Sequence, residues 1–183
     1  YVMLTLLCIL SLMLCGMPAF DAINYSLCTT ATGGYGTHSA LLGDYYHSPA
    51  IEYVLIFFMF ISGVNYTLIY YTILKGKVKK FFSDAELKAY LVIVLGASLI
   101  CTLVLVLADS AQDVEASIRH SLFTVISLQT TTGLATVDYT VWPVQLMPVL
   151  LFVMLAGASS GSTSGGFKCV RLSIIYRVLK NDS

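Results

Sequence analysis

Two short threonine- and glycine-rich stretches carry the residue types that could do chemistry in this chain of 183 residues. The first, TTATGGYGTH, occupies residues 29–38, and the second, TTTGLAT, occupies residues 130–136. A turn that directs several backbone carbonyl groups at one axis can replace the water shell of an alkali ion. Glycine permits the positive φ angles that such a turn needs, and threonine hydroxyl groups can support the strand. The stretches therefore predict that backbone oxygens bind a cation.

Eight residues at the centres of these stretches are the candidate filter for ions. We expect them to supply ligands mainly through their backbone oxygens, because carbonyl groups are the ligands that suit a dehydrated alkali ion. The candidate residues are Thr32, Gly33, Gly34 and Tyr35 in the first stretch, and Thr131, Thr132, Gly133 and Leu134 in the second.

The surrounding sequence has the composition of a membrane protein. Apolar residues make up 57% of the chain and charged residues 11%, whereas a soluble domain has about 25% charged residues. Nearly charge-free blocks have close to the roughly 20 residues that cross the hydrocarbon layer. The first block has neither a charged start nor a small-residue cleavage site, so we interpret it as part of a helix rather than a cleaved signal peptide. The blocks are residues 1–17, 49–74, 89–107 and 142–176.

The basic residues predict the orientation of these blocks. Nine of the ten Lys and Arg residues lie in two clusters, and the exception is Arg119. Under the positive-inside rule both clusters are cytoplasmic. The clusters are Lys75, Lys77, Lys79, Lys80 and Lys88 after the second block, and Lys168, Arg171, Arg177 and Lys180 at the end of the fourth.

The chain also contains an internal repeat. A shift of 99 residues aligns Thr32 with Thr131 and Gly34 with Gly133. Each unit consists of an apolar helix, a short amphipathic segment, a Thr/Gly turn and a second apolar helix, so a repeat architecture is indicated. We expect one unit at residues 1–80 and the other at 81–183.

The short segments of the repeat, residues 20–31 and 115–130, are too short to cross a bilayer. We expect them to be re-entrant helices that enter from the outer face, beginning near Asp21 and Glu115 and ending at the turns. Unpaired backbone groups are costly in lipid, so the turns must be buried in protein or line a watery cavity. The negative end of each helix dipole would then stabilise a cation by up to roughly 2 kcal/mol. Simple helix breaks or small-residue packing are the alternative, but two turns in register favour ion conduction.

The segments TATGGYGTH and SPAIEYVLIFFMFISGVNYTL, together with TTTGLAT and WPVQLMPVLLFVMLAGASSGSTSGGFK, closely resemble the membrane subunit of bacterial Trk/Ktr-type potassium uptake systems, the TrkH/KtrB superfamily. The resemblance runs from about residue 20 to 177. It implies an all-α integral membrane protein with tandem helix–re-entrant pore loop–helix repeats, which form part of a four-fold pseudo-symmetric ion pore. This chain resembles the second and third of the four units. The central filter glycine of the family matches Gly34 and Gly133, which implies potassium bound by the carbonyl groups of Thr32, Gly33, Thr131 and Thr132.

The segment GASSGSTSGG, residues 157–166, interrupts the fourth block. A continuous helix there would lose around 1 kcal/mol per glycine relative to alanine, so we expect an irregular loop that faces a cavity. It resembles the intramembrane gating loop of the family, although Ser164 stands where the family typically has glycine. A close-packing helix surface is the alternative, and a phosphate loop does not fit because Phe167 precedes Lys168. The implied gate residues are Gly157, Ser160, Gly161, Ser162, Thr163, Gly165 and Gly166.

The resemblance implies potassium uptake across the bacterial cytoplasmic (inner) membrane by a multi-pass protein. Channel-like passage and coupling to protons or sodium are both compatible with the sequence. The implied partners are the lipid bilayer, a second copy in a homodimer, a cytoplasmic regulatory nucleotide-binding subunit and the remaining pore units, which this chain lacks. Potassium is the only bound cofactor we expect, and we expect neither a nucleic-acid partner nor enzymatic activity. The alternatives are a sodium-permeable or sodium-coupled cation transporter and a non-conducting membrane scaffold.

Several other polar residues have more ordinary interpretations. The five scattered cysteines are typical of small buried side chains. His38, His47 and His120 lie on the predicted outer side and indicate neither a metal site nor a catalytic triad. Glu52 could pair at the outer interface. Asn65 and Thr67 could line the inner vestibule or form an interhelical hydrogen bond.

Overall fold

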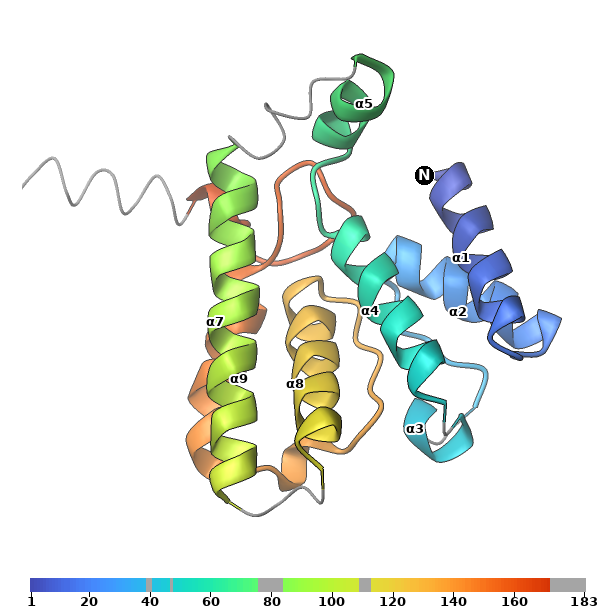
Figure 1. Cartoon of the computed structure of the whole chain (residues 1–183). Helices are drawn as coiled ribbons and strands as arrows, with labels where there is room; N and C mark the ends of the chain where they lie inside the picture. Colours follow the sequence, from blue (N-terminus) through green and yellow to red (C-terminus); the bar gives the residue numbers. More distant parts are fainter. Residues whose placement is uncertain (39–40, 47, 76–83, 109–112, 172–183) are drawn as a thin grey trace, which may run out of the picture.

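The computed structural model of the chain describes residues 1–38, 41–46, 48–75, 84–108 and 113–171. All regular elements in these ranges are helices (Figure 1), so the predicted all-α fold is confirmed. Several predicted features lie outside the described residues. These are the boundary between the two predicted units at residue 80, and the residues His47, Lys77, Lys79, Lys80, Arg177 and Lys180.

The helices follow the order of the predicted repeat. In Figure 1 the short helices α2 and α8 each follow one apolar helix and precede another. The first half contains α1 (Val2–Leu14), α2 (Ala19–Ala31), α3 (Leu42–Tyr45), α4 (Pro49–Ser62) and α5 (Tyr66–Lys75). The second half contains α7 (Ala85–Leu107), α8 (Val114–Gln129), the 3-10 turns η1 (Tyr139–Val141) and η2 (Val144–Leu146), and α9 (Met147–Ala156).

The two halves pack through α4 and the short helices. α8 contacts α7, α4 and α9, while α2 contacts α1 and α4. The packing buries large side chains between the halves, including Tyr25, Leu55, Tyr90 and Phe123. Both short helices therefore pack against at least two other helices, which is the environment that a re-entrant segment needs.

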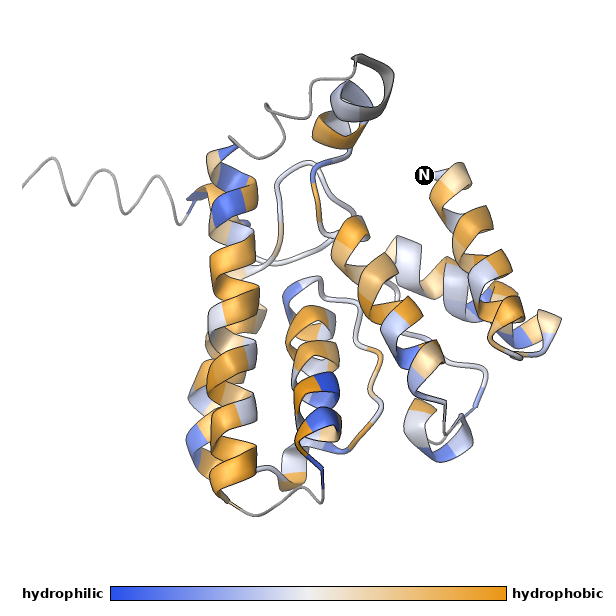
Figure 2. Cartoon of the chain, viewed as in Figure 1, coloured by the Kyte–Doolittle hydropathy of each residue, from blue (hydrophilic) through white to orange (hydrophobic). Residues whose placement is uncertain are grey.

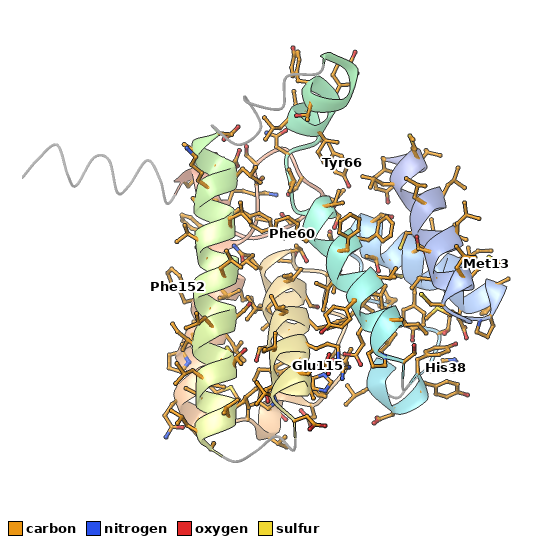
Figure 3. The ribbon with its side chains drawn as sticks, in the orientation of Figure 1. Met13, His38, Phe60, Tyr66, Glu115 and Phe152 are labelled. Carbon is orange, nitrogen blue, oxygen red and sulfur yellow. The ribbon has the colours of Figure 1, made fainter. Side chains whose placement is uncertain are left out.

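One described helix, α7, is long and apolar enough to cross a membrane by itself, with 23 residues and a mean hydropathy of 2.8 over an 18-residue window. The predicted third block is therefore a single helix. Figure 2 shows α1, α4, α7 and α9 as mostly hydrophobic. Their exposed apolar side chains include Met13 and Phe152, which lie on opposite flanks in Figure 3. These flanks match hydrocarbon or further membrane helices better than water.

The prediction of one continuous span over residues 49–74 is wrong. α4 and α5 pass the length and hydropathy test only together, and their axes differ by 96°. The cause is a long-range contact at the break, where the Gly63 carbonyl accepts a hydrogen bond from the Ser159 amide at 3.1 Å. The Tyr66 amide donates to the Gly161 carbonyl at 3.1 Å. Backbone groups that would continue the helix are thus bonded to the Gly/Ser-rich segment instead.

Asn65 lies in this break and begins the next helix. Its Oδ1 accepts a hydrogen bond from the Thr67 amide at 2.9 Å, so the side chain caps α5. A Cβ atom on Gly161 would lie 2.2 Å from the same Oδ1. The Gly/Ser-rich segment therefore packs directly onto the break, where a larger residue at 161 would displace the Asn65 side chain.

Candidate functional site

Both Thr/Gly turns lie directly after the short helices. α2 ends at Ala31 and α8 ends at Gln129, within one residue of the bounds expected for the re-entrant segments. Asp21 and Glu115 lie in the first turns of these helices. Each helix therefore directs its C-terminal end at a turn, and this end of the helix dipole favours a cation.

The aligned residues of the two turns share one backbone conformation. Thr32 and Thr131 have φ angles of 53° and 55°, and Gly34 and Gly133 have φ angles of 72° and 78°. Positive φ is uncommon for threonine. Because the same unusual geometry occurs at both positions, the alignment of these residues found in the sequence is also an alignment in space.

The two turns lie against each other. A Cβ atom on Gly34 would lie 2.2 Å from the carbonyl oxygen of Thr132, and one on Gly133 would lie 3.8 Å from the Cα atom of Gly34. A small cavity of about 170 Å³ adjoins this contact. The structure therefore brings the two candidate filter segments together, with glycine required at residue 34 for steric reasons.

Hydroxyl groups behind the second turn hold its backbone. The Ser127 hydroxyl donates to the Leu134 carbonyl at 2.6 Å, and the Thr130 and Thr132 hydroxyls lie 2.8 Å apart. Of the candidate residues, Thr132 and Leu134 are buried, whereas Tyr35 is 79% exposed. Sequence reasoning expected threonine support but missed Ser127. The signal for Ser127 was a small hydroxyl residue on the last turn of the short helix.

The Gly/Ser-rich segment is not helical from residue 157 to 168. Gly157 and Gly166 have φ angles of 65° and 80°, so the backbone at both ends of the segment adopts a conformation that favours glycine. This observation removes the alternative of a close-packing helix surface. In Figure 1 the segment crosses beyond the C-terminal end of α8, where the predicted filter begins.

The Gly/Ser-rich loop is hydrogen-bonded to both candidate filter segments. Thr32 Oγ1 donates to the Thr163 carbonyl at 3.0 Å, and the Gly165 amide donates to Thr131 Oγ1 at 2.7 Å. Gln129 Nε2, at the end of α8, donates to the Gly157 carbonyl at 3.2 Å. The aligned threonines of the repeat therefore both contact one loop, Thr32 as a hydrogen-bond donor and Thr131 as an acceptor.

Two charged side chains form hydrogen bonds with other residues of this loop. Glu86, in the first turn of α7, accepts hydrogen bonds from the Ser160 amide and, at 3.3 Å, from the Ser160 hydroxyl. The Lys168 ammonium group donates to the Ser164 carbonyl. Sequence reasoning did not single out Glu86. The sequence feature that pointed to Glu86 was an acidic residue at the start of an otherwise apolar span.

An ion-pair cluster lies toward the opposite end of α8, with Arg119 and Glu52 buried and Glu115 exposed. The Arg119 guanidinium group contacts the carboxylates of Glu52 and Glu115, with Nε 3.1 Å from Glu115 Oε1. His120 Nδ1 lies 3.4 Å from Glu52 Oε2 and also 3.4 Å from Thr136 Oγ1. Glu52 is 3% exposed. Its expected partner is thus present, but the pair joins α4 to α8 inside the protein.

A second polar cluster lies at the start of α2. The Asp21 carboxylate accepts a hydrogen bond from the Tyr46 hydroxyl and lies 3.3 Å from His38 Nε2. The Tyr46 hydrogen bond holds the pKa of Asp21 below its usual value.

Figure 3 shows His38 and Glu115 toward one end of the molecule and Tyr66 toward the other. In the described ranges no group of three or more His, Cys, Asp and Glu side chains is arranged to hold a metal ion.

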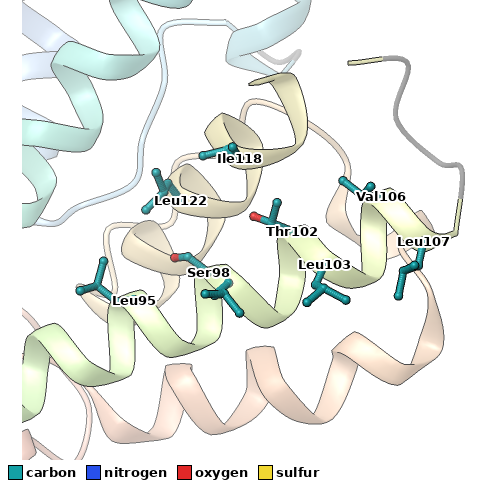
Figure 4. A pocket seen from close by; sticks show the side chains of 9 residues that line it. Leu95, Ser98, Thr102, Leu103, Val106, Leu107, Ile118 and Leu122 are labelled. Atoms are coloured by element: carbon teal, nitrogen blue, oxygen red, sulfur yellow. The ribbon is translucent and has the colours of Figure 1, made fainter. Parts of the chain in front are cut away.

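An apolar groove lies between α7 and α8 (Figure 4) and has a volume of about 690 Å³. Its lining is hydrocarbon apart from the hydroxyls of Ser98 and Thr102. A cation needs a shell of oxygen ligands. We therefore assign no ion-binding role to this groove.

Comparisons with known proteins agree with the family read from the motifs. The family model described as TrkH, cation transport protein, matches residues 1–183. The potassium uptake protein TrkH of Salmonella typhimurium is 38% identical over 178 residues, which are 97% of this chain and 36% of that protein. The potassium uptake protein TrkG of Escherichia coli K12 is 37% identical over 182 residues, 100% of this chain and 37% of that protein.

A solved structure shares the fold. The crystal structure of the potassium transporter TrkH from Vibrio parahaemolyticus matches with a TM-score of 0.91 and 35% sequence identity. The match covers 98% of this chain and 40% of that chain. The resemblance found in the sequence is thereby confirmed, and the chain spans little more than a third of the length of the curated relatives.

Proposed function

This chain belongs to the TrkH family of cation transport proteins, and from that premise we propose that it forms two of the four units of a potassium uptake pore. The relatives that it matches are named as potassium uptake proteins. A membrane location agrees with the apolar α7 and with the family. We propose the bacterial cytoplasmic membrane as that location, and transport rather than catalysis as the activity.

The observation that carries this proposal is the meeting of two aligned turns at the C-terminal ends of two short helices. Gly34 lies against the carbonyl group of Thr132, so the two turns meet where the helix dipoles favour a cation. Potassium would be held by the carbonyl groups of Thr32, Gly33, Thr131 and Thr132. The full filter would be completed by the units that this chain does not contain.

We further propose that the Gly/Ser-rich loop, residues 157–166, gates the pore. Its hydrogen bonds to Thr32 and Thr131 place it against both filter segments. A loop at this position obstructs the path of an ion that leaves the filter. Movement of the loop would then open the path without changing the filter ligands.

Two assembly partners complete the proposal. A second copy would form a homodimer, and a regulatory nucleotide-binding subunit would dock on the face that carries the basic clusters. Of those clusters the structure describes Lys75 at the end of α5, Lys88 near the start of α7, and Lys168 and Arg171 after the loop. Positive residues of this kind favour the cytoplasmic side.

The test is rubidium uptake by liposomes that contain the complete transporter carrying this chain. We expect labelled rubidium to enter, with potassium but not sodium as a competitor, and Gly34→Ser to weaken that preference. Equal competition by sodium would favour a sodium-permeable transporter. Absence of uptake by correctly folded wild-type protein would favour a non-conducting scaffold.

A further inference from the structure

A short helix outside the filter connects the first unit to the filter strand of the second. The Leu42 amide, at the start of α3, donates to the Ala135 carbonyl at 3.0 Å. A Cβ atom on Gly43 would lie 2.2 Å from the Thr136 carbonyl oxygen and 3.2 Å from its carbon. α3 therefore touches this strand backbone to backbone, with no side chain between them.

The position of α3 depends in turn on the start of α2. The Tyr46 hydroxyl, directly after α3, donates to the Asp21 carboxylate. His38 lies 3.3 Å from the same carboxylate, and its ring stacks on that of Tyr45 with centroids 3.6 Å apart. Asp21 is 7% exposed. The buried Asp21 carboxylate thus contacts one residue before α3, His38, and one residue after it, Tyr46.

The same filter strand is held from its other side by the second unit. His120 Nδ1 lies 3.4 Å from Thr136 Oγ1 and 3.4 Å from Glu52 Oε2. Thr136 is 2% exposed. The outer end of the strand, Ala135 and Thr136, is therefore enclosed between α3 and α8 and follows any displacement of either one.

We propose that Asp21, Tyr46 and α3 form an outer brace that positions the filter strand of the second unit and thereby sets the preference for potassium over sodium. This inference rests on the proposed function. Carbonyl ligands select an ion by their number and position, and the strand that bears them at Thr132 and Gly133 continues directly into Ala135 and Thr136. Gly43 is the positioning residue of the brace because any larger side chain displaces the Thr136 carbonyl.

The test compares Gly43→Ala with Gly96→Ala in the complete transporter, reconstituted in liposomes. Gly96 lies in α7, and a Cβ atom there would meet no atom within 4 Å. We expect Gly43→Ala to reduce the potassium-over-sodium preference of rubidium uptake by about tenfold, equivalent to about 1.4 kcal/mol. Gly96→Ala should retain the wild-type preference. Folded protein is measured by gel filtration, because a merely structural role would lower its amount without changing the preference.

A second variant, Tyr46→Phe, keeps the ring but removes the hydrogen bond to Asp21. We expect a smaller loss of the potassium-over-sodium preference in the same assay. If Gly43→Ala does not fold, Tyr46→Phe serves as the test of the brace. Wild-type preference in folded Gly43→Ala, or in Tyr46→Phe where the former is not obtained, would overturn the brace alone. Absence of rubidium uptake by the wild-type protein would overturn the proposed function and the brace together.

Discussion

At the residue scale, Gly34 and Gly133 of the proposed filter face different constraints. A Cβ atom on Gly34 would lie 2.2 Å from the Thr132 carbonyl oxygen, whereas one on Gly133 would be 3.8 Å from its nearest neighbour. Both substitutions carry a backbone strain of roughly 1–2 kcal/mol from positive φ. We therefore expect Gly34→Ala to abolish most of the potassium preference of rubidium uptake, and Gly133→Ala to lower thermal stability with a smaller loss of preference. Equal losses of preference in the two variants would show that backbone strain, and not contact with the Thr132 carbonyl group, causes the loss.

The Arg119–Glu52 pair is also a residue-scale feature, because both side chains are largely buried. Removing one partner of a buried ion pair leaves an uncompensated charge and costs about 3–5 kcal/mol. We expect Arg119→Met to lower the unfolding temperature in detergent strongly, and Arg119→Met combined with Glu52→Met to recover much of it. Additive losses in the double variant would contradict a direct interaction between the two charges.

At the element scale, the Gly/Ser-rich loop is held at the filter by threonines and at α7 by Glu86. A hydrogen bond to a charged group contributes about 1.5–3 kcal/mol when shielded from water, and the exposure of the Glu86–Ser160 contact reduces this value. We expect Glu86→Ala to raise rubidium uptake roughly a few-fold while the potassium preference stays unchanged. Deletion within residues 157–166 should raise uptake further.

The matched control is Asp113→Asn, which changes an exposed carboxylate at the opposite end of α7, beside the start of α8. The Asp113 side chain makes no capping hydrogen bond, so uptake should equal that of the wild type. Unchanged uptake in Glu86→Ala, with a normal amount of folded protein, would argue against a role of this contact in gating.

At the scale of the whole molecule, α1, α7 and α9 expose large apolar side chains, and the chain covers 36% of the TrkH protein of Salmonella typhimurium. Under the proposed function, these two filter segments are half of the four that surround the pore. We therefore expect residues 1–183 alone, reconstituted in liposomes, to show no potassium-selective rubidium uptake, whereas the complete transporter shows it. Selective uptake by the isolated chain would indicate that its copies assemble into a closed pore.

The sequence by itself determined the features that depend on neighbouring residues. The positive φ angles at Gly34 and Gly133 belong to turns whose conformation is local, so residue types and their spacing were sufficient to locate both. The span of α7 follows from a continuous apolar run, and the ends of α2 and α8 were located within one residue. The repeat and the family resemblance rest on the same local signals.

Only the tertiary structure decided the features that join distant residues. The break between α4 and α5 depends on hydrogen bonds from Gly63 and Tyr66 to a loop almost a hundred residues away, and an apolar run gives no sign of it. The contacts of Glu86 with Ser160 and of Gly43 with Thr136 are likewise long-range. Such pairings leave no periodic pattern in the chain, because they arise from packing of whole helices rather than from local backbone preference.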